Sequence, residues 1–235
     1  MDLVLQNGFY LSRRLIEISN EPQVVQRTSQ WFRAREKLIT GSIVDSILGT
    51  NPYSSVHEVV VNKSVGRSAG SFRGNAFTRH GTKYESRALE LYLQTHHPKS
   101  KILSYGVVKH DDVGFLAHSP DGILVHPTSE EAPKLLEVKC PATRQPPASG
   151  VLAIPPQYYH QIQLGLEVFK LESADYVEYF CETESRPESI YVTTLYKDPD
   201  WLLNNLQAFQ RFWKAVDTYK EQVIPCLLPP LEIEN

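Results

Sequence analysis

The sequence has few cysteines and no long apolar run, and both absences exclude classes of protein. Its three cysteines, Cys140, Cys181 and Cys226, form no C-x-x-C pair. Neither a disulfide framework nor a zinc site built on thiolates is therefore expected. No stretch of about 18 apolar residues is present, which excludes a transmembrane helix. Gln6 and Asn7 interrupt an N-terminal segment that lacks a basic start, so we expect no signal peptide and an intracellular location, in either cytoplasm or nucleus.

Short motifs of several common enzyme classes are also missing. The sequence contains no G-x-x-x-x-G-K-[ST] phosphate loop, no G-x-G-x-x-G after a strand, no G-x-S-x-G elbow and no H-E-x-x-H pair. A P-loop NTPase, a dinucleotide-binding enzyme, an α/β-hydrolase and a zinc protease of that type therefore have little support.

The composition is that of an ordinary globular protein, but charge is divided unevenly along the chain. The 235 residues are 41% hydrophobic and 22% charged, which suits a sizeable core and one domain. Residues 1–109 carry 15 Lys and Arg against 8 Asp and Glu, whereas residues 110–235 carry 9 against 19. A basic half attracts phosphate and an acidic half attracts divalent cations, although uneven surface charge without a function explains the counts equally well.

Hydrophobic periodicity predicts helices mixed with strands. Helices are expected at residues 23–39, 43–48, 81–96, 157–170 and 200–220. Strands are expected at residues 101–108, 114–118, 123–126, 135–138, 176–181 and 190–196, the last two as a pair. This order favours an α/β fold with a single mixed β-sheet flanked by helices. No linker divides the chain, so we predict one domain over residues 1–235, including an N-terminal extension (1–30) and a C-terminal tail (221–235).

Glu137 and Lys139 are charged residues in a segment that otherwise predicts a buried strand. They lie two residues apart, so both side chains point to one face of the strand. A solvated pair on an edge strand is the simpler explanation. Asp121 favours a site instead, because it follows a strand in the turn 119–122 and opens a hairpin towards Glu137. Antiparallel strands of this length place Asp121 near Glu137 and Lys139.

Two helical residues extend this pattern. Glu85 shares a helix face with Ala88 and Leu89, where a charge is costly unless it is paired or bound to a metal. Gln161 lies on an apolar stripe with Leu164. Each of these polar residues has a simpler explanation as a buried group satisfied by the backbone. Four such features around one set of strands are better explained by a site: the Glu137–Lys139 pair, Asp121, Glu85 and Gln161.

Carboxylates and a lysine at a sheet edge are typical of metal-dependent hydrolytic sites. Asp121, Glu137 and the carbonyl of Val138 offer the hard oxygen ligands that Mg²⁺ or Mn²⁺ prefers. Such a metal polarises a phosphate oxygen and acidifies a bound water, and a second ion stabilises the leaving oxygen. Lys139 would orient or deprotonate the attacking water and stabilise the developing charge.

Five blocks of sequence carry these residues in a recognisable order. They are Trp31…Arg35…Ile39-Thr40-Gly41-Ser42, Gly81-Thr82-Lys83-Tyr84-Glu85, Ser119-Pro120-Asp121-Gly122, Leu136-Glu137-Val138-Lys139-Cys140-Pro141 and Tyr159-His160-Gln161-Ile162-Gln163. Asp121 with Glu137-Val138-Lys139 is the PD-(D/E)XK nuclease signature, which is weakly specific alone. The five blocks together resemble the lambda exonuclease (YqaJ-type viral recombinase) family from about Trp31 to Val168. The resemblance implies a restriction-endonuclease-like core.

The resemblance also implies an activity and a set of roles. It implies a metal-dependent 5′→3′ exonuclease that digests one strand of duplex DNA to 5′-mononucleotides in recombination or repair. A single-strand annealing protein is an implied partner, and a ring-shaped homotrimer is an implied assembly. By position, Asp121 and Glu137 resemble ligands of one or two Mg²⁺ ions, and Lys139 the catalytic lysine. Glu85 resembles a carboxylate that reaches the metals through water, and Gln161 a supporting glutamine.

A second group of side chains resembles the family's grip on a 5′-phosphate: Arg35, Thr40, Ser42 and Ser119. The Arg35 guanidinium can fork onto a phosphate, and Ser42 sits at a predicted helix start, where free N–H groups favour an anion. A salt bridge from Arg35 to Glu36 or Asp45 is the alternative explanation. Ser42 and Asp45 also fit a loose capping box.

The chain departs from the phage member of the family before the glycine of the helix block. The phage member has a bulky apolar wedge and an aromatic residue there, whereas this chain has Thr78-Arg79-His80-Gly81, with Phe77 as a candidate substitute. Single-stranded or nicked DNA is therefore a further candidate substrate. A structure-specific or sequence-specific endonuclease, and a non-catalytic nucleic-acid-binding module, are the alternative functions. RNA stays open as a substrate, because no residue clearly recognises a 2′-hydroxyl.

Overall fold

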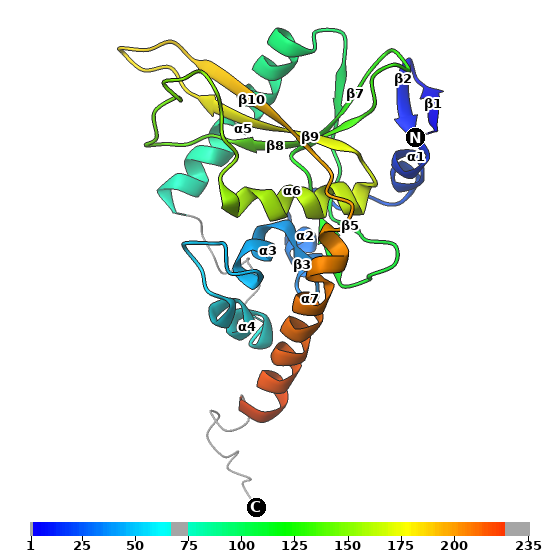
Figure 1. The fold of residues 1–235 in the computed structure, drawn as a ribbon, viewed down its shortest axis with the longest axis vertical. Helices are drawn as coiled ribbons and strands as arrows, with labels where there is room; N and C mark the ends of the chain where they lie inside the picture. Colours follow the sequence, from blue (N-terminus) through cyan, green and yellow to red (C-terminus); the bar gives the residue numbers. More distant parts are fainter. Residues whose placement is uncertain (1, 67–74, 224–235) are drawn as a thin grey trace, which may run out of the picture.

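The computed structural model describes residues 2–66 and 75–223 and has a central sheet of five strands (Figure 1). The strand order is β10-β9-β8-β7-β4. β8 and β9 are parallel and the other neighbours are antiparallel, so the sheet is mixed. The strands are β4 (Lys101–Leu103), β7 (Gly122–Val125), β8 (Lys134–Lys139), β9 (Ser173–Phe180) and β10 (Ser189–Tyr196).

Two smaller sheets accompany the central one. The first has the order β3-β6-β5, formed by β3 (Ile39–Thr40), β5 (Val108–Lys109) and β6 (Leu116–His118). The second is the hairpin of β1 (Leu3–Gln6) and β2 (Phe9–Ser12). The predicted α/β class with a mixed sheet is confirmed, but the strands do not share a single sheet.

The predicted strand 101–108 explains the division into sheets. It breaks into β4 and β5, which pair in different sheets. The break surrounds Gly106, whose N–H donates to Gln23 Oε1 at 3.0 Å. A Cβ atom at Gly106 would lie 2.2 Å from the carbonyl oxygen of Val24, so this segment pairs with the incoming N-terminal chain instead of continuing the strand.

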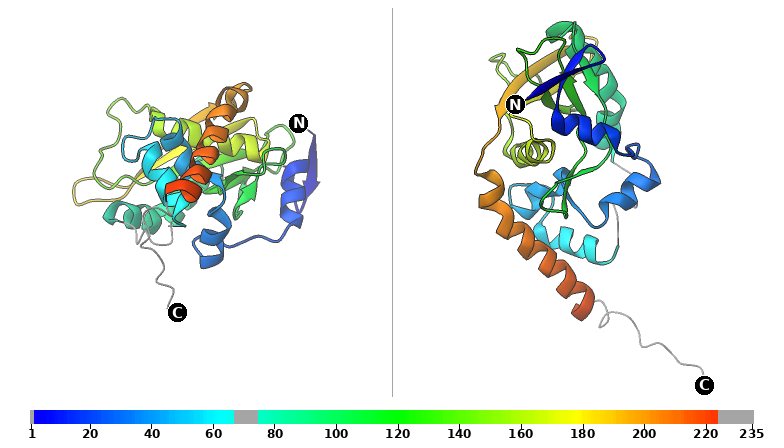
Figure 2. Two further views of the ribbon diagram at one scale, coloured as in Figure 1. Left: turned by 90° about the horizontal axis from the view of Figure 1, so that it is seen from below. Right: turned by 90° about the vertical axis from the view of Figure 1, so that its right-hand side faces the viewer.

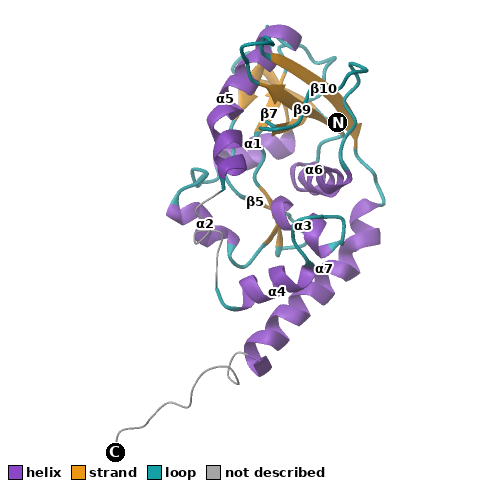
Figure 3. Cartoon of the chain, turned by 90° about the vertical axis from the view of Figure 1, so that its left-hand side faces the viewer, coloured by secondary structure: helices purple, strands orange, loops and turns teal. Residues whose placement is uncertain are grey.

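Helices cover both faces of the central sheet. The helices are α1 (Arg13–Asn20), α2 (Ser29–Arg35), α3 (Gly41–Ile47), α4 (Val56–Ser64), α5 (Ala76–His96), α6 (Pro156–Phe169) and α7 (Trp201–Thr218), with a π-helical turn at Tyr219–Val223. α5 and α6 lie on opposite faces of the sheet (Figures 2 and 3). α3, α4 and α7 gather on the side of α6 away from the sheet (Figure 1).

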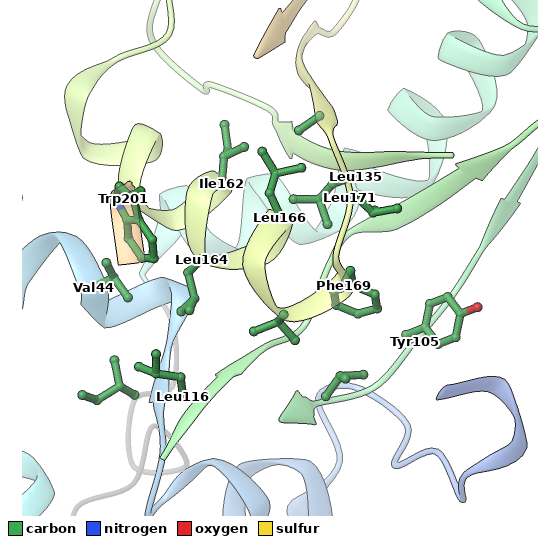
Figure 4. Close-up of a cluster of buried hydrophobic side chains, with 14 of the residues drawn as sticks. Val44, Tyr105, Leu116, Leu135, Ile162, Leu164, Leu166, Phe169, Leu171 and Trp201 are labelled. Atoms are coloured by element: carbon green, nitrogen blue, oxygen red, sulfur yellow. The ribbon is translucent and has the colours of Figure 1, made fainter. Parts of the chain in front are cut away.

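The core consists of two buried clusters separated by the sheet. The larger cluster surrounds α6 and includes Leu135 of β8, with Leu164 and Phe169 of α6 (Figure 4). The smaller cluster lies under α5, where Tyr92 packs with Leu136 of β8. Alternate residues of β8 therefore enter different clusters, as the period of a strand requires.

Four helices differ from the sequence prediction. α1 lies in the segment predicted as an N-terminal extension (1–30), where no helix was expected before residue 23. α2 is shorter than the predicted helix 23–39, because Arg27 has a left-handed φ of 66° and Thr28 caps the helix start through the Trp31 N–H. α4 was not predicted, although Ser55 and Glu58 form its capping box. α5 begins at Ala76, before the predicted start at residue 81, and Asn75 is its N-cap.

The capping box predicted from Ser42 and Asp45 is wrong. Thr40 is the N-cap of α3 and makes no side-chain cap hydrogen bond. Its Oγ1 accepts a hydrogen bond from Arg35 instead, at 3.0 Å. The Thr40 hydroxyl therefore binds a neighbouring arginine and does not cap the helix.

Within the described ranges, no helix has the length and apolar character that a membrane span would need. Cys140 and Cys181 are free thiols. The third cysteine, Cys226, and the tail beyond residue 223 lie outside the described residues.

Candidate active site

The turn before β7 places Asp121 beside the end of β8. The antiparallel register pairs Gly122 with Leu136, so Asp121 faces Glu137. The Val138 N–H donates to Asp121 Oδ2 at 2.7 Å. The predicted proximity of Asp121 and Glu137 is therefore observed. The site is not at a sheet edge, however, because β8 is the middle strand of five.

Glu137 is buried, which rules out the solvated pair considered from the sequence. Its side chain is 1% exposed, and Oε1 forms an ion pair with Lys139 Nζ. Oε1 also accepts a hydrogen bond from Gln161 Nε2 of α6 at 2.7 Å. Burial raises the pKa of Glu137 to about 7, with a further increase from Asp121 and an opposing effect from Lys139.

Lys139 is held in its protonated form. Burial acts to lower the pKa of its amine, but the negative charges of Glu137 and Asp121 outweigh burial and raise it. The ammonium group also lies 4.8 Å from the ring centre of Tyr158, where a cation is favoured. This surrounding suits a lysine that orients a water or a phosphate oxygen, rather than one that accepts a proton.

Glu85 reaches the same group of acids from α5. Burial raises its pKa, and the charge of Asp121 raises it further. Glu85 Oε2 forms an ion pair with Arg27 Nη2 at 2.5 Å. The sequence analysis inferred that a charge on this apolar helix face needs a partner. Arg27, which that analysis did not single out, is the partner. We call Glu85, Asp121 and Glu137 the carboxylate cluster.

The carboxylate cluster fits a divalent cation. Its three carboxylates have two cationic partners, Arg27 and Lys139, and burial together with the charge of Asp121 still raises the pKa of Glu85 and Glu137. Asp45 of α3 was also missed as a neighbour. Burial raises the pKa of Asp45 to about 7, and Lys139 opposes that increase. Carboxylate oxygens with a short supply of counter-charge are the donor set that Mg²⁺ or Mn²⁺ suits.

A second region is built around Arg35, which has no acidic hydrogen-bond partner among the described residues. Arg35 Nη2 donates to Thr40 Oγ1 at 3.0 Å and to Ser42 Oγ at 2.8 Å, and Nη1 donates to Ser119 Oγ at 3.2 Å. We call these four residues the Arg35 pocket. Burial lowers the pKa of Arg35 to about 10, so it stays charged at neutral pH. The structure thus brings together all four side chains that the sequence analysis grouped.

The alternative salt bridges of Arg35 are not formed. Among the described residues, its side-chain hydrogen bonds go to three hydroxyl groups and to no carboxylate. Its guanidinium carbon also lies 4.1 Å from the ring centre of Trp31. The indole Nε1 of Trp31 donates to Ser119 Oγ at 3.1 Å. Trp31 therefore fixes both Arg35 and its hydroxyl partner.

Lys63 adds a second cation that the sequence analysis did not identify. Its amine donates to the carbonyl oxygens of Arg35, Glu36 and Leu38 at 2.8 to 3.1 Å. Burial and the neighbouring Arg35 lower the pKa of Lys63 to about 8. Lys63 and Arg35 line one cavity of about 240 Å³. No local sequence pattern marks Lys63, because it contacts α2 only through the fold.

His118 separates the two regions. Its ring lies against Gly41 of α3 and Gly165 of α6, where Cβ atoms would come within 2.7 and 3.0 Å of its nitrogens. Neither ring nitrogen has a hydrogen-bond partner among the described residues. Burial lowers the pKa of His118 to about 3, and the charges of Arg35 and Lys139 lower it further. The ring is therefore a neutral spacer.

The fold and the site together define a class of protein. A mixed sheet flanked by helices, with Asp121 and Glu137-Val138-Lys139 meeting at its middle strands, is a PD-(D/E)XK, restriction-endonuclease-like core. Residues 30–175, more than half of the chain, match the YqaJ-like viral recombinase domain. The chain belongs to that family, as the sequence resemblance predicted.

Comparison with individual proteins agrees with this assignment. The chain is 28% identical over 185 residues to the uncharacterized protein R354 of Acanthamoeba polyphaga mimivirus. The match covers 74% of this chain but 33% of that relative, so the chain spans about a third of the relative's length.

Solved structures share the fold at low sequence identity. An alkaline exonuclease from Laribacter hongkongensis superposes with a TM-score of 0.65 at 22% identity, covering 83% of this chain and 95% of that one. The protein of a SOX–DNA complex superposes with a TM-score of 0.50 at 12% identity, covering 80% of this chain and 66% of that one. At these identities the likeness establishes the fold.

Proposed function

We propose that the chain is a metal-dependent DNA exonuclease that acts 5′→3′ on duplex ends and releases 5′-mononucleotides in recombination or repair. The turn 119–121 is the observation that carries this proposal. Ser119 is a member of the Arg35 pocket, and Asp121 is a member of the carboxylate cluster. Two residues span at most about 7 Å, which is close to the spacing of successive phosphates on one strand.

The Arg35 pocket would hold the terminal phosphate. A guanidinium with no acidic partner among the described residues, and with three hydroxyl groups around it, offers charge-assisted hydrogen bonds to a phosphate. A phosphate held there would place the next phosphodiester beside the carboxylate cluster. Cleavage at that point releases one nucleotide from a 5′ end, which favours an exonuclease over an endonuclease.

Asp121, Glu137 and the Val138 carbonyl would hold one or two Mg²⁺ ions, or Mn²⁺ in their place, with Glu85 acting through water. When bound, the metal would polarise the scissile phosphate and acidify a water. Gln161 fixes Oε1 of Glu137 by its hydrogen bond, and the Val138 N–H fixes Oδ2 of Asp121. The protonated amine of Lys139 would orient the attacking water and stabilise charge that develops on the phosphate.

The first turn of α5 would meet the end of the duplex. Phe77 lies there and is 60% exposed, so it is our candidate for the wedge that separates the strands. If it cannot act as one, single-stranded or nicked DNA will be cut faster than blunt duplex ends.

The partner and assembly in this proposal rest on the resemblance alone, and the location rests on the N-terminal sequence. They are a single-strand annealing protein, a ring-shaped homotrimer and an intracellular site of action. Light scattering on the purified chain tests the trimer, which a monomer mass would contradict.

Digestion of end-labelled DNA in Mg²⁺ tests the proposed activity. Linear duplexes with a 5′-phosphate should release labelled mononucleotides faster than duplexes with a 5′-hydroxyl, and a covalently closed circle should stay intact. Internal cuts in the circle would support an endonuclease of the same fold. DNA binding without any product would support a non-catalytic module, and an RNA duplex run in parallel decides between DNA and RNA.

A further inference from the structure

A cluster of metal-ligating side chains lies at the other end of β7 from the carboxylate cluster. One ring nitrogen each from His97 and His126 and a carboxylate oxygen of Glu131 lie within 4.8 Å of one another. Asp121 precedes β7 and His126 follows it. Along α5, Glu85 and His97 are twelve residues apart, or about 18 Å. This cluster is therefore separate from the proposed nuclease site.

Backbone hydrogen bonds hold the main chain at both histidines. The carbonyl oxygen of His126 accepts a hydrogen bond from the N–H of Tyr10 at 2.8 Å. His97 caps the C-terminus of α5, and its carbonyl oxygen accepts from the N–H of Ser100 at 3.0 Å. Glu131 lies in the loop between β7 and β8, and its side chain is 56% exposed. The rings of His97 and His126 contact each other edge to face with centroids 5.4 Å apart, and the exposed Glu131 side chain has more freedom to move.

His126 is a buried side chain with unused capacity. Its side chain is 1% exposed, and Nδ1 lies 3.1 Å from Glu131 Oε2 and 3.0 Å from Ser100 Oγ. Nε2 is buried and has no partner among the described residues. Because Nδ1 is the nitrogen that faces Glu131, an ion in the cluster would bind there, and Nε2 would carry the ring proton.

The charges around the cluster also suit a cation. Burial lowers the pKa of both imidazoles. Two carboxylates face the histidines, because Glu131 lies at His126 and Asp175 Oδ2 lies 4.0 Å from His97 Nε2. The nearby cation, Lys134, pairs with Asp175 at 3.0 Å and also lowers the pKa of both rings.

We propose that His97, His126 and Glu131 bind one zinc-type transition-metal ion, with water as the fourth ligand. Two imidazoles and a carboxylate are a donor set that Zn²⁺ takes, whereas Mg²⁺ prefers oxygen ligands alone. Tetrahedral Zn²⁺ needs its ligand atoms about 3.3 Å apart; His126 Nδ1 and Glu131 Oε2 are already 3.1 Å apart, so the adjustment falls on His97. The ion fastens the end of α5 to the end of β7 and the loop that follows it.

Spectroscopic titration with Co²⁺ tests this site without any nuclease assay. The full chain is stripped with EDTA, dialysed and titrated at pH 7.5, because tetrahedral Co²⁺ absorbs strongly in the visible range while octahedral Co²⁺ on oxygen ligands absorbs weakly. We expect strong absorption that saturates at one equivalent and is displaced by Zn²⁺. Zn²⁺ at about 100 times its Kd should raise the Tm of the stripped protein by at least about 5 °C. A chain that gives no strong absorption, or no Tm increase with Zn²⁺, overturns the proposal.

Variants assign the absorption to its ligands. His97→Ala and Glu131→Gln should each weaken Co²⁺ binding by at least about tenfold, since even outer-shell changes cost that much. His96→Ala is the matched control, because His96 is the exposed neighbour in the same helix end. Unchanged Co²⁺ affinity in both ligand variants, or an equal loss in the control, overturns the assignment. His126→Ala completes the set. If it fails to fold, His97→Ala and Glu131→Gln still decide the assignment.

Discussion

The carboxylate cluster and the Arg35 pocket are electrostatic opposites at the two ends of one turn. In the cluster, burial and mutual repulsion raise the pKa of Glu85 and Glu137. At the cavity that Arg35 shares with Lys63, burial lowers the pKa of both cations, and Arg35 has no acidic hydrogen-bond partner among the described residues. The cluster has three carboxylates against two cationic partners, Arg27 and Lys139, whereas the Arg35 guanidinium has no carboxylate partner among the described residues. A metal ion and a phosphate would complete them, and a DNA end supplies phosphates to both.

The charge division along the sequence explains part of this contrast. The pocket cations come from the basic half, and Asp121 and Glu137 come from the acidic half. Glu85 and Lys139 are the exceptions, each of opposite sign to the half that contains it. Both exceptions lie at the proposed nuclease site, so net charge along the chain locates the two regions but not the chemistry between them.

Removal of Lys139 should have the largest effect. Lys139→Ala deletes the ammonium that would orient water and stabilise developing charge, so kcat should fall by about 10²–10⁴-fold. Duplex affinity should change much less, because the Arg35 pocket is intact. Release of labelled mononucleotides under single-turnover conditions measures the loss of catalytic rate. A gel-shift titration in Ca²⁺ measures the duplex affinity.

Lys101→Ala is the matched control for that variant. Lys101 lies on the edge strand β4 of the same sheet and is exposed. It should keep nearly full activity. Nucleotide release by Lys139→Ala at the rate of the control would remove Lys139 from the mechanism.

Removal of Arg35 should have the next largest effect and should depend on the DNA end. Arg35→Ala loses charge-assisted hydrogen bonds to a terminal phosphate, so kcat/KM on 5′-phosphorylated ends should fall about 10–100-fold. Ends with a 5′-hydroxyl should be affected far less. Arg33→Ala, an exposed arginine of the same helix, is the control and should leave the ratio between the two ends unchanged. An equal loss on both ends would contradict the phosphate pocket.

Spacing rules predicted the acidic region well. The two-residue separation of Glu137 and Lys139 fixes a shared face, and the short hairpin from Asp121 fixes their neighbour. The structure places Gln161 on Glu137 as well, because one helix face carries it. These relations follow from strand and helix periods, which a sequence displays directly.

The partners that come from distant segments could not be predicted in the same way. Arg27 reaches Glu85 across 58 residues from a left-handed backbone position. Lys63 reaches three carbonyl groups at the end of α2 from a helix that the sequence analysis did not predict. Asp45 was assigned to a cap. Each depends on how helices pack, and no local period records that packing. The division into three sheets has the same origin at Gly106.

Enlarging Gly41 should disturb both regions at once. A Cβ there would lie 2.7 Å from His118 Nδ1 and 3.0 Å from Gln161 Cγ. His118 cannot retreat, since Gly165 closes its other side, so Gly41→Ala should lower the free energy of unfolding by about 1–3 kcal/mol. Gly81→Ala is the control, because Gly81 in α5 has open space around its Cα. It should stabilise by about 0.5–1 kcal/mol in urea unfolding. A neutral Gly41→Ala would show that the spacing between the regions is adjustable.

Acidification should reduce the stability that the buried, neutral ring of His118 contributes. The pKa of His118 is about 3 when folded and about 6.5 when unfolded, because burial and two cations disfavour its charged form. The unfolded chain therefore binds a proton first as the pH falls. Stability contributed by neutral His118 is complete above pH 6.5 and decreases below it, by about 2 kcal/mol at pH 5. His118→Phe removes this contribution, so its unfolding free energy should fall less between pH 7.5 and pH 5 than that of the parent. His57→Phe, at an exposed histidine, is the control and should leave the change of unfolding free energy with pH as it is in the parent. If the parent and His118→Phe lose the same unfolding free energy between pH 7.5 and pH 5, the His118 ring is already hydrated.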